Sequence, residues 1–177
     1  MNELKKIISL NLLKDIFKKD KLKYYLHKLV TLNAAPTKIG FSVAIGIFIG
    51  LLIPMGLQTI FVIPLAMATG SNVAIAYAAT LISNPFTIIP IYYLAIKIGV
   101  YFTKINFTWN EFNVVINNPS YANIMKLGTD GLIVFFTGSF LQAIIFSALF
   151  YIISVKTIVY LRKRKFNLSK SVSEDVN

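Results

Sequence analysis

Residues 54–59 read Pro-Met-Gly-Leu-Gln-Thr, and residues 83–87 read Ser-Asn-Pro-Phe-Thr. Both stretches interrupt the segment from Ile39 to Ile96, which contains no charged side chain. In a lipid bilayer, backbone N–H and C=O groups that a helix break sets free must find partners in protein or in cavity water. Broken helices at membrane depth therefore usually line a binding site or a water-filled space. These two polar breaks decide the fold that we expect.

The composition predicts an all-α integral membrane protein of one domain. Hydrophobic residues make up 56% of the 177 residues and charged residues 14%, against ~45–50% and ~25% in typical soluble domains. The net charge of +11 is concentrated at the two ends of the chain. We therefore expect the lipid bilayer and its anionic headgroups as partners, and no nucleic acid. The composition is also compatible with an oligomer.

Few residues could carry out chemistry. The chain has no cysteine and one histidine, His27, which argues against disulfides, thiol chemistry and a His/Cys metal site. No carboxylate occurs between Asp20 and Glu111. General acid–base and metal-assisted catalysis consequently have almost no candidates in the apolar part of the chain. We expect no enzyme activity, no catalytic residues, no metal and no cofactor.

Residues 1–35 are expected to form a basic amphipathic helix. Apolar residues recur at helical spacing and lysines fill much of the other side, which is typical of a helix lying on a membrane surface; the apolar positions are Leu4, Ile7, Ile8, Leu12, Leu13, Ile16 and Phe17. The alternative is a solvated charged helix that packs on a partner. On a helix at the membrane surface, His27 is expected to contact lipid headgroups or to have no role.

The first apolar segment is too short to cross a bilayer. Pro36 is placed to open a helix, and residues 39–53 rise only ~22 Å against a hydrocarbon core of ~30 Å. We therefore expect a re-entrant hairpin over residues 39–69, in which Gly46 and Gly50 form a G-x-x-x-G face for close helix packing. A rival topology with four full crossings needs two spans that are both too short.

The second apolar segment is expected to be a broken span over residues 72–102. Gly70-Ser71-Asn72 ends one helix and caps the next, and Asn84-Pro85 breaks the span because a residue before proline is pushed out of the helical region. The residues that we assign to the structural motif of the breaks are Pro54, Gly56, Asn72 and Pro85.

Residues 103–130 are polar and nearly neutral, as expected for an external loop. Thr108 and Glu111 fit a capping box that starts a short helix, and Pro119 ends it. Residues 131–155 are uncharged and long enough to form a transmembrane helix with room for tilt. Within it, Ser139, Ala143 and Ser147 form a small-residue stripe, and we expect Gln142 to hydrogen-bond across helices.

The distribution of basic residues predicts the topology. Lysines and arginines near span ends favour the cytoplasm, so both termini are expected inside, with a basic cytoplasmic tail over 157–177. Its last part, residues 166–177, looks like a disordered tail. An even number of crossings follows: 39–69 enters and leaves on one face, 72–102 goes outward, and 131–155 returns.

Together these motifs resemble a known family, the domain of unknown function 2062, whose members are small bacterial inner-membrane proteins. The resemblance covers roughly residues 30–155 and implies a multi-pass location in the bacterial inner (cytoplasmic) membrane; it implies no activity. Some similar proteins carry this domain fused to a glycosyltransferase, which points toward lipid-linked sugars or polyprenyl carriers. The matching residues are Pro36, Gly40, Ala44, Gly46, Pro54, Gly56-Leu57-Gln58-Thr59, Asn72, Asn84-Pro85-Phe86-Thr87 and Gly99.

The candidate substrate-binding residues are polar or charged groups near the breaks: Gln58, Thr59, Asn84, Thr87 and Lys97. Half-helix starts offer free N–H groups that attract phosphate or carboxylate. The alternative is that the two polar pairs only cap the broken backbone and that Lys97 reaches outward to the membrane surface. A weak repeat with a 29-residue shift places Gln58 on Thr87, so the two pairs are expected to share one polar cavity.

These observations lead to two hypotheses about function, which belong to different classes. The first is transport or flipping of an anionic lipid or small solute through the polar site formed by the two breaks. The second is a non-transporting membrane module that docks or organises a cytoplasmic or lipid-linked-sugar enzyme through its basic termini.

Overall fold

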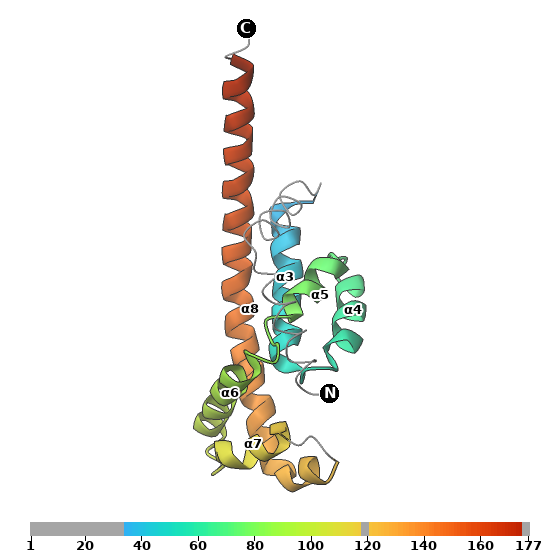
Figure 1. Cartoon of the computed structure of the whole chain (residues 1–177), viewed down its shortest axis with the longest axis vertical. Coiled ribbons are helices and arrows are strands. Elements are labelled where there is room, and N and C mark those ends of the chain that lie inside the picture. Colours follow the sequence, from blue (N-terminus) through green and yellow to red (C-terminus); the bar gives the residue numbers. More distant parts are fainter. Residues whose placement is uncertain (1–33, 118–120, 175–177) are drawn as a thin grey trace, which may run out of the picture. The chain divides into compact units, whose positions relative to one another are not determined.

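The computed structural model describes residues 34–117 and 121–174, and all the regular structure in these ranges is helical (Figure 1). The helices are α3 (Pro36–Leu52), α4 (Gln58–Ala68), α5 (Val73–Thr80), α6 (Ile88–Thr103), α7 (Trp109–Asn117) and α8 (Tyr121–Glu174). The chain divides into two units, residues 37–155 and the two terminal segments 1–36 with 156–177. In the terminal unit, Arg162 Nη2 donates a hydrogen bond of 2.9 Å to the Ala34 carbonyl.

The surface helix predicted over residues 1–35 and the single histidine, His27, fall outside the described residues, apart from Ala34 and Ala35.

Helices α3 and α4 cover most of residues 39–69, for which the sequence predicts a re-entrant hairpin. They run in opposite directions (Figure 1) and are joined by residues 53–57. Gly56 lies in this turn with φ +103°, a backbone conformation that side chains with a Cβ resist. A Cβ on Gly56 would meet nothing within 4 Å, so the turn needs glycine for its backbone angle and not for a close approach. The two helices share a buried cluster with α5: Ile45, Ile49, Val62, Ala66 and Ala76.

Helix α5 starts where the sequence places its cap. Asn72 Oδ1 accepts a 3.0 Å hydrogen bond from the Ile75 N–H, and the Asn72 N–H donates to Ser42 Oγ on α3 at 2.9 Å. The turn before it contains Gly70 at φ +62°. α4 and α5 consequently pack against each other as a short helical pair.

The G-x-x-x-G face of α3 packs on α5, as the sequence predicts. A Cβ on Gly46 would overlap the carbonyl oxygen of Ala76, and one on Gly50 would lie 3.0 Å from the carbonyl oxygen of Thr80. Backbone contact of this kind is what small residues at helix crossings permit. The position of the second break relative to α3 is therefore set by glycine packing.

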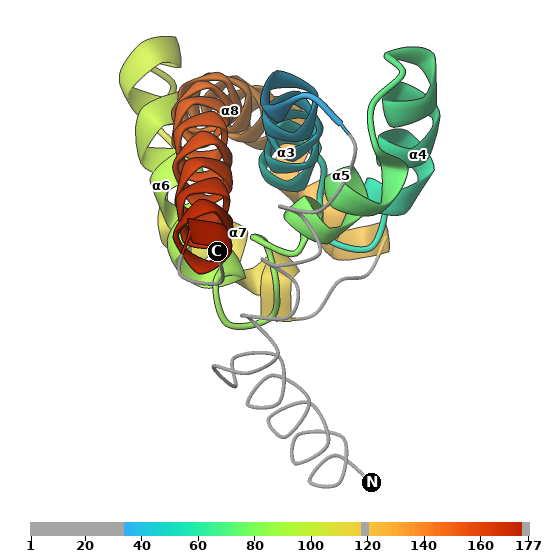
Figure 2. The same ribbon diagram turned by 90° about the horizontal axis from the view of Figure 1, so that it is seen from above.

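Glycines also set the crossing of α6 and α8. A Cβ on Gly138 of α8 would overlap the Ala95 carbonyl, and one on Gly99 of α6 would overlap the Val134 carbonyl. The residue numbers rise along one helix as they fall along the other, so the two helices are antiparallel. α3 also lies beside the residue 128–155 part of α8 (Figures 1 and 2), where Gly40 meets Tyr151.

The capping box of α7 is formed as predicted. The backbone N–H and the hydroxyl of Thr108 both donate to Glu111 Oε2 at 2.7 Å. The hydroxyl bond, followed by the backbone bond, holds the pKa of Glu111 below its ordinary value. From α7, Phe112 enters a buried cluster with residues of α6 and α8, namely Tyr92, Ile96, Val134 and Phe135.

Two expectations for the loop and the tail need correction. Residues 103–130, expected as an external loop with one short helix, contain that helix as α7 and, in addition, helical turns at 121–127 that lead into α8. The segment expected as a disordered tail is helical as far as Glu174. Lysine and arginine are good helix formers, and extending an existing helix avoids the cost of nucleation.

The long C-terminal helix is confirmed. The stretch Gly128–Arg164 is long and apolar enough to cross a membrane, and it contains the predicted span 131–155. It begins at Gly128, whose non-helical backbone interrupts α8. This candidate span indicates that the protein is associated with a membrane.

Candidate functional site

The first break is repaired by Gln58. In a continuous helix the Gly50 carbonyl would accept from the N–H of residue 54, but Pro54 has none. Gln58 Nε2 instead donates to the Gly50 carbonyl at 3.0 Å and to the Ile53 carbonyl at 3.2 Å. The side chain is buried, at 7% exposure. Gln58 therefore satisfies the carbonyls that the break sets free.

The second break repairs itself with its own side chains. Pro85 cannot donate to the Leu81 carbonyl, and Asn84 Nδ2 takes that place at 3.2 Å. The Thr87 hydroxyl donates to the Ile82 carbonyl. Asn84 Oδ1 also accepts from the N–H groups of Phe86 and Thr87. Asn84 and Thr87 are thus local caps of the broken backbone.

Two hydrogen bonds connect the breaks. Gln58 Nε2 donates to the hydroxyl of Ser83 at 2.6 Å, a buried contact. The Met55 N–H donates to the phenol oxygen of Tyr92 on α6 at 3.0 Å. The breaks therefore meet, as the sequence predicts, but through Ser83 and Tyr92. In the described residues no hydrogen bond joins Gln58 or Thr59 to Asn84 or Thr87.

Thr59 and Lys97 lie apart from this network. Thr59 is exposed. Lys97 is also exposed, and its ammonium lies 5.5 Å from the centre of the Tyr93 ring on the same helix. Of the five candidate substrate-binding residues, only Gln58 takes part in a hydrogen bond between the breaks within the described residues.

The start of α4 is open to hydrogen-bond acceptors. No side chain caps this helix. Within the described part of the chain, the backbone N–H groups of Gly56, Gln58 and Thr59 donate to no other group. Unpaired N–H groups at a helix start, together with the helix dipole, favour a negatively charged group. The first break can therefore bind an anion, whereas the second has spent much of its capacity on its own caps.

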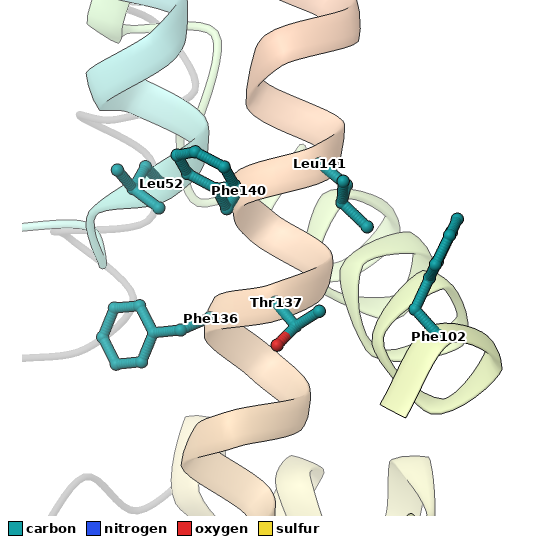
Figure 3. A pocket seen from close by; sticks show the side chains of 6 residues that line it. All are labelled: Leu52, Phe102, Phe136, Thr137, Phe140 and Leu141. Carbon is teal, nitrogen blue, oxygen red and sulfur yellow. The ribbon is translucent and has the colours of Figure 1, made fainter. Parts of the chain in front are cut away.

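Apart from the two breaks, residues of α3, α6 and α8 line an open groove of about 440 Å³. Figure 3 shows Leu52 of α3 and Phe102 of α6 facing residues of α8 across it. Its other lining residues are Phe136, Thr137, Phe140 and Leu141. With Thr137 as the one polar residue among these six, the groove is not the predicted polar cavity.

Sequence reasoning missed Ser83 and Tyr92 as members of the site. Ser83 stands inside the quoted stretch 83–87, so its position beside the break was a usable signal. In the described residues the buried Gln142 Oε1 has no hydrogen-bond partner, so the bond predicted across helices is absent for this oxygen, and the buried Ser139 Oγ has none either. Of the small-residue stripe, Ala143 joins a buried cluster with Ile47 and Leu51 of α3.

No curated protein and no solved structure matches the chain. A family model does match, over residues 19–167, and its description is "Uncharacterized protein conserved in bacteria (DUF2062)". Because the match covers most of the chain, this protein belongs to the DUF2062 family.

Proposed function

We propose that this protein is a multi-pass protein of the bacterial cytoplasmic membrane that binds an anionic lipid at its two helix breaks and moves it between the leaflets. The observation that carries the proposal is the buried contact of Gln58 with Ser83, which joins the two breaks. Discontinuous helices that meet in this way form substrate sites in many transporters. Both termini are cytoplasmic in this proposal.

The anion-binding part of the proposed site is the first turn of α4. The N–H groups of Gln58 and Thr59 in this turn, and that of Gly56 just before it, are paired with no group in the described residues and are suited to a phosphate oxygen. Met55, Gly56, Leu57 and Thr59 are exposed, so a headgroup can reach these groups. In hydrocarbon, unpaired N–H groups cost several kcal/mol each, by order of magnitude, which favours their use by a ligand.

We propose further that the protein is not an enzyme. The chain has no carboxylate between Asp20 and Glu111 and no cysteine. The residues near the breaks are amides, hydroxyls and a phenol, which bind and orient a ligand but are poor general acids or bases at neutral pH. Moving a lipid requires only binding and release, and this is the class of function that such a site supports.

The test uses purified protein in vesicles of phosphatidylcholine that contain a fluorescent phosphatidylglycerol. Dithionite added outside destroys the fluorescence of the outer leaflet only, so transfer between leaflets appears as further loss of signal. We expect the wild-type protein to raise the rate over protein-free vesicles and Gln58→Met to abolish the increase. Asn110→Ala, which changes an exposed side chain of α7, is the control. A wild-type rate equal to that of empty vesicles would refute the proposal.

A further inference from the structure

Two buried side chains of α8, Ser139 and Gln142, each carry a polar atom that bonds to nothing in the described residues. Ser139 is 0% exposed and Gln142 is 2% exposed. The Ser139 hydroxyl oxygen and the Gln142 carboxamide oxygen have no hydrogen-bond partner. A buried polar atom without a partner costs roughly 1–3 kcal/mol, and native structures contain few of them. Two such atoms three residues apart on α8 call for an explanation.

Their position follows from the register of the antiparallel pair α6 and α8. Gly138 meets Ala95 and Gly99 meets Val134. One further turn along each helix brings Gln142 level with Ile91. Ile91 packs against the cluster that contains Ala143 and Leu51. Ser139 and Gln142 therefore lie between the side of α8 that faces α6 and the side that faces α3.

This level is also the level of the two breaks. Leu51 lies one residue before the end of α3 at Leu52, where the first break begins. Ile91 stands three residues after the start of α6, where the second break ends, and the next residue is Tyr92, whose phenol oxygen accepts from Met55. α8 thus contributes two unpaired polar groups at the depth at which Gln58 and Ser83 join the breaks.

We propose that Ser139 and Gln142 bind the hydroxyl groups of a lipid headgroup whose phosphate occupies the start of α4. This inference rests on the proposed function and extends it to the substrate class, an anionic phospholipid with hydroxyls on its headgroup. The chemistry of the two atoms selects this class. A carboxamide oxygen only accepts, and a serine hydroxyl accepts and donates, so both suit an alcohol better than a bare phosphate.

The conformation described here is the closed one for this part of the site. Ser139 is fully buried, so a headgroup reaches it only when α8 separates from α3 and α6 at this level. Separation exposes both atoms to the ligand, and closure without a ligand leaves both atoms unpaired. The two unpaired atoms thus favour the separation of α8 from α3 and α6. Apolar residues at these two positions would not favour it.

The experiment measures the thermal stability of the purified full-length protein in detergent micelles that contain a defined lipid. Phosphatidylglycerol offers a phosphate and two headgroup hydroxyls, and phosphatidic acid offers the phosphate without them. We expect phosphatidylglycerol to raise Tm more than phosphatidic acid does. Ser139→Ala and Gln142→Leu are expected to abolish that difference while the effect of phosphatidic acid remains.

The sign of the change without added lipid separates a binding role from a structural one. Replacing an unpaired buried polar atom by an apolar group is neutral or stabilising, so both variants are expected to melt at or above the wild-type Tm without lipid. A clear fall would show that the two side chains support the fold, and the inference would be wrong. Equal stabilisation of the wild type by the two lipids would also overturn it.

The same two lipids, carried as fluorescent derivatives in the vesicle assay, distinguish this inference from the proposed function. If the wild-type protein moves both lipids at one rate, and the variants do the same, lipid transfer stands and the assignment of Ser139 and Gln142 fails. If the protein moves neither lipid while the difference in Tm is present and is lost in the variants, the headgroup assignment holds and the transfer function fails.

Discussion

Replacing Gln58 by methionine is expected to destabilise the protein through the backbone of the first break. Methionine keeps the length and apolar contacts of the side chain but has no N–H to donate. The change removes the buried bonds to the Gly50 carbonyl and to Ser83 Oγ and the partly buried bond to the Ile53 carbonyl. Gly50 cannot recover a partner from its own helix, because the residue four places on is Pro54.

The magnitude follows from the two buried groups that lose their partner. Each costs roughly 1–3 kcal/mol when left unpaired, which gives about 2–6 kcal/mol for the Gly50 carbonyl and the Ser83 hydroxyl together. For a chain of this length, 1 kcal/mol corresponds to about 2–4 °C in Tm. We therefore expect Gln58→Met to lower Tm by at least about 4 °C.

The assay is thermal unfolding of the detergent-purified protein at one fixed scan rate, since Tm depends on that rate when unfolding is irreversible. Thr59→Val is the matched control, because Thr59 is the next residue in the sequence, is exposed and donates no side-chain hydrogen bond in the described part of the chain. A Tm of Gln58→Met equal to that of Thr59→Val would refute the idea that Gln58 repairs the break.

Three further outcomes are expected. Gly138→Ala, whose Cβ would overlap backbone atoms of α6, is expected to lower the yield of folded protein sharply. The control is Gly70→Ala, at φ +62° with open space around it, which is expected to cost only about 1–2 kcal/mol of folding free energy. Equal yields of the two variants would contradict glycine-mediated packing. The lowered pKa of Glu111 means that its contribution to folding is full above the ordinary glutamate pKa and is lost as the pH falls through the lowered value. The fluorescence of Trp109, the one tryptophan, is expected to report this acid transition of α7, and the same titration of Glu111→Gln is expected to lack it. Alkaline phosphatase is expected to be active when fused at the end of α7 and inactive at the C-terminus of the chain, and the reverse pattern would overturn the proposed topology.

Local signals in the sequence predicted local structure well. The prolines placed both breaks, the Thr108–Glu111 spacing placed the start of α7, and Gly70-Ser71-Asn72 placed the cap of α5, which is Asn72. Each of these depends on groups within a few residues of one another, so the chain alone determines them. The uncharged run 131–155 predicted the long apolar helix for the same reason.

The partners of the side chains could not be predicted, because they depend on how the helices cross. The sequence pairs Gln58 with Thr87 through a 29-residue shift, but the backbone repeats with a shift of 30: Leu57 has φ −93° and ψ −13°, and Thr87 has φ −94° and ψ −13°. The two turns thus share a backbone shape. The amide that replaces the missing proline N–H comes from Gln58 at the first break and from Asn84 at the second. The 29-residue shift matches side-chain types, whereas the backbone angles match at a shift of 30.

The two breaks also differ in which residues hold them in shape: the first depends on residues at and after the second, and the second does not depend on the first. The second break is closed by hydrogen bonds among residues 81–87, so its shape does not depend on the first. The first break has its own bonds from Gln58 to the Gly50 and Ile53 carbonyls, but it is also held from outside, by Ser83 on Gln58 and by the Tyr92 phenol on Met55. A change at Ser83 or Tyr92 therefore reaches the open N–H groups at the start of α4, whereas a change at Gln58 leaves the caps of the second break in place. The self-contained break acts as the fixed support, and the break that it holds carries the free N–H groups suited to an anion.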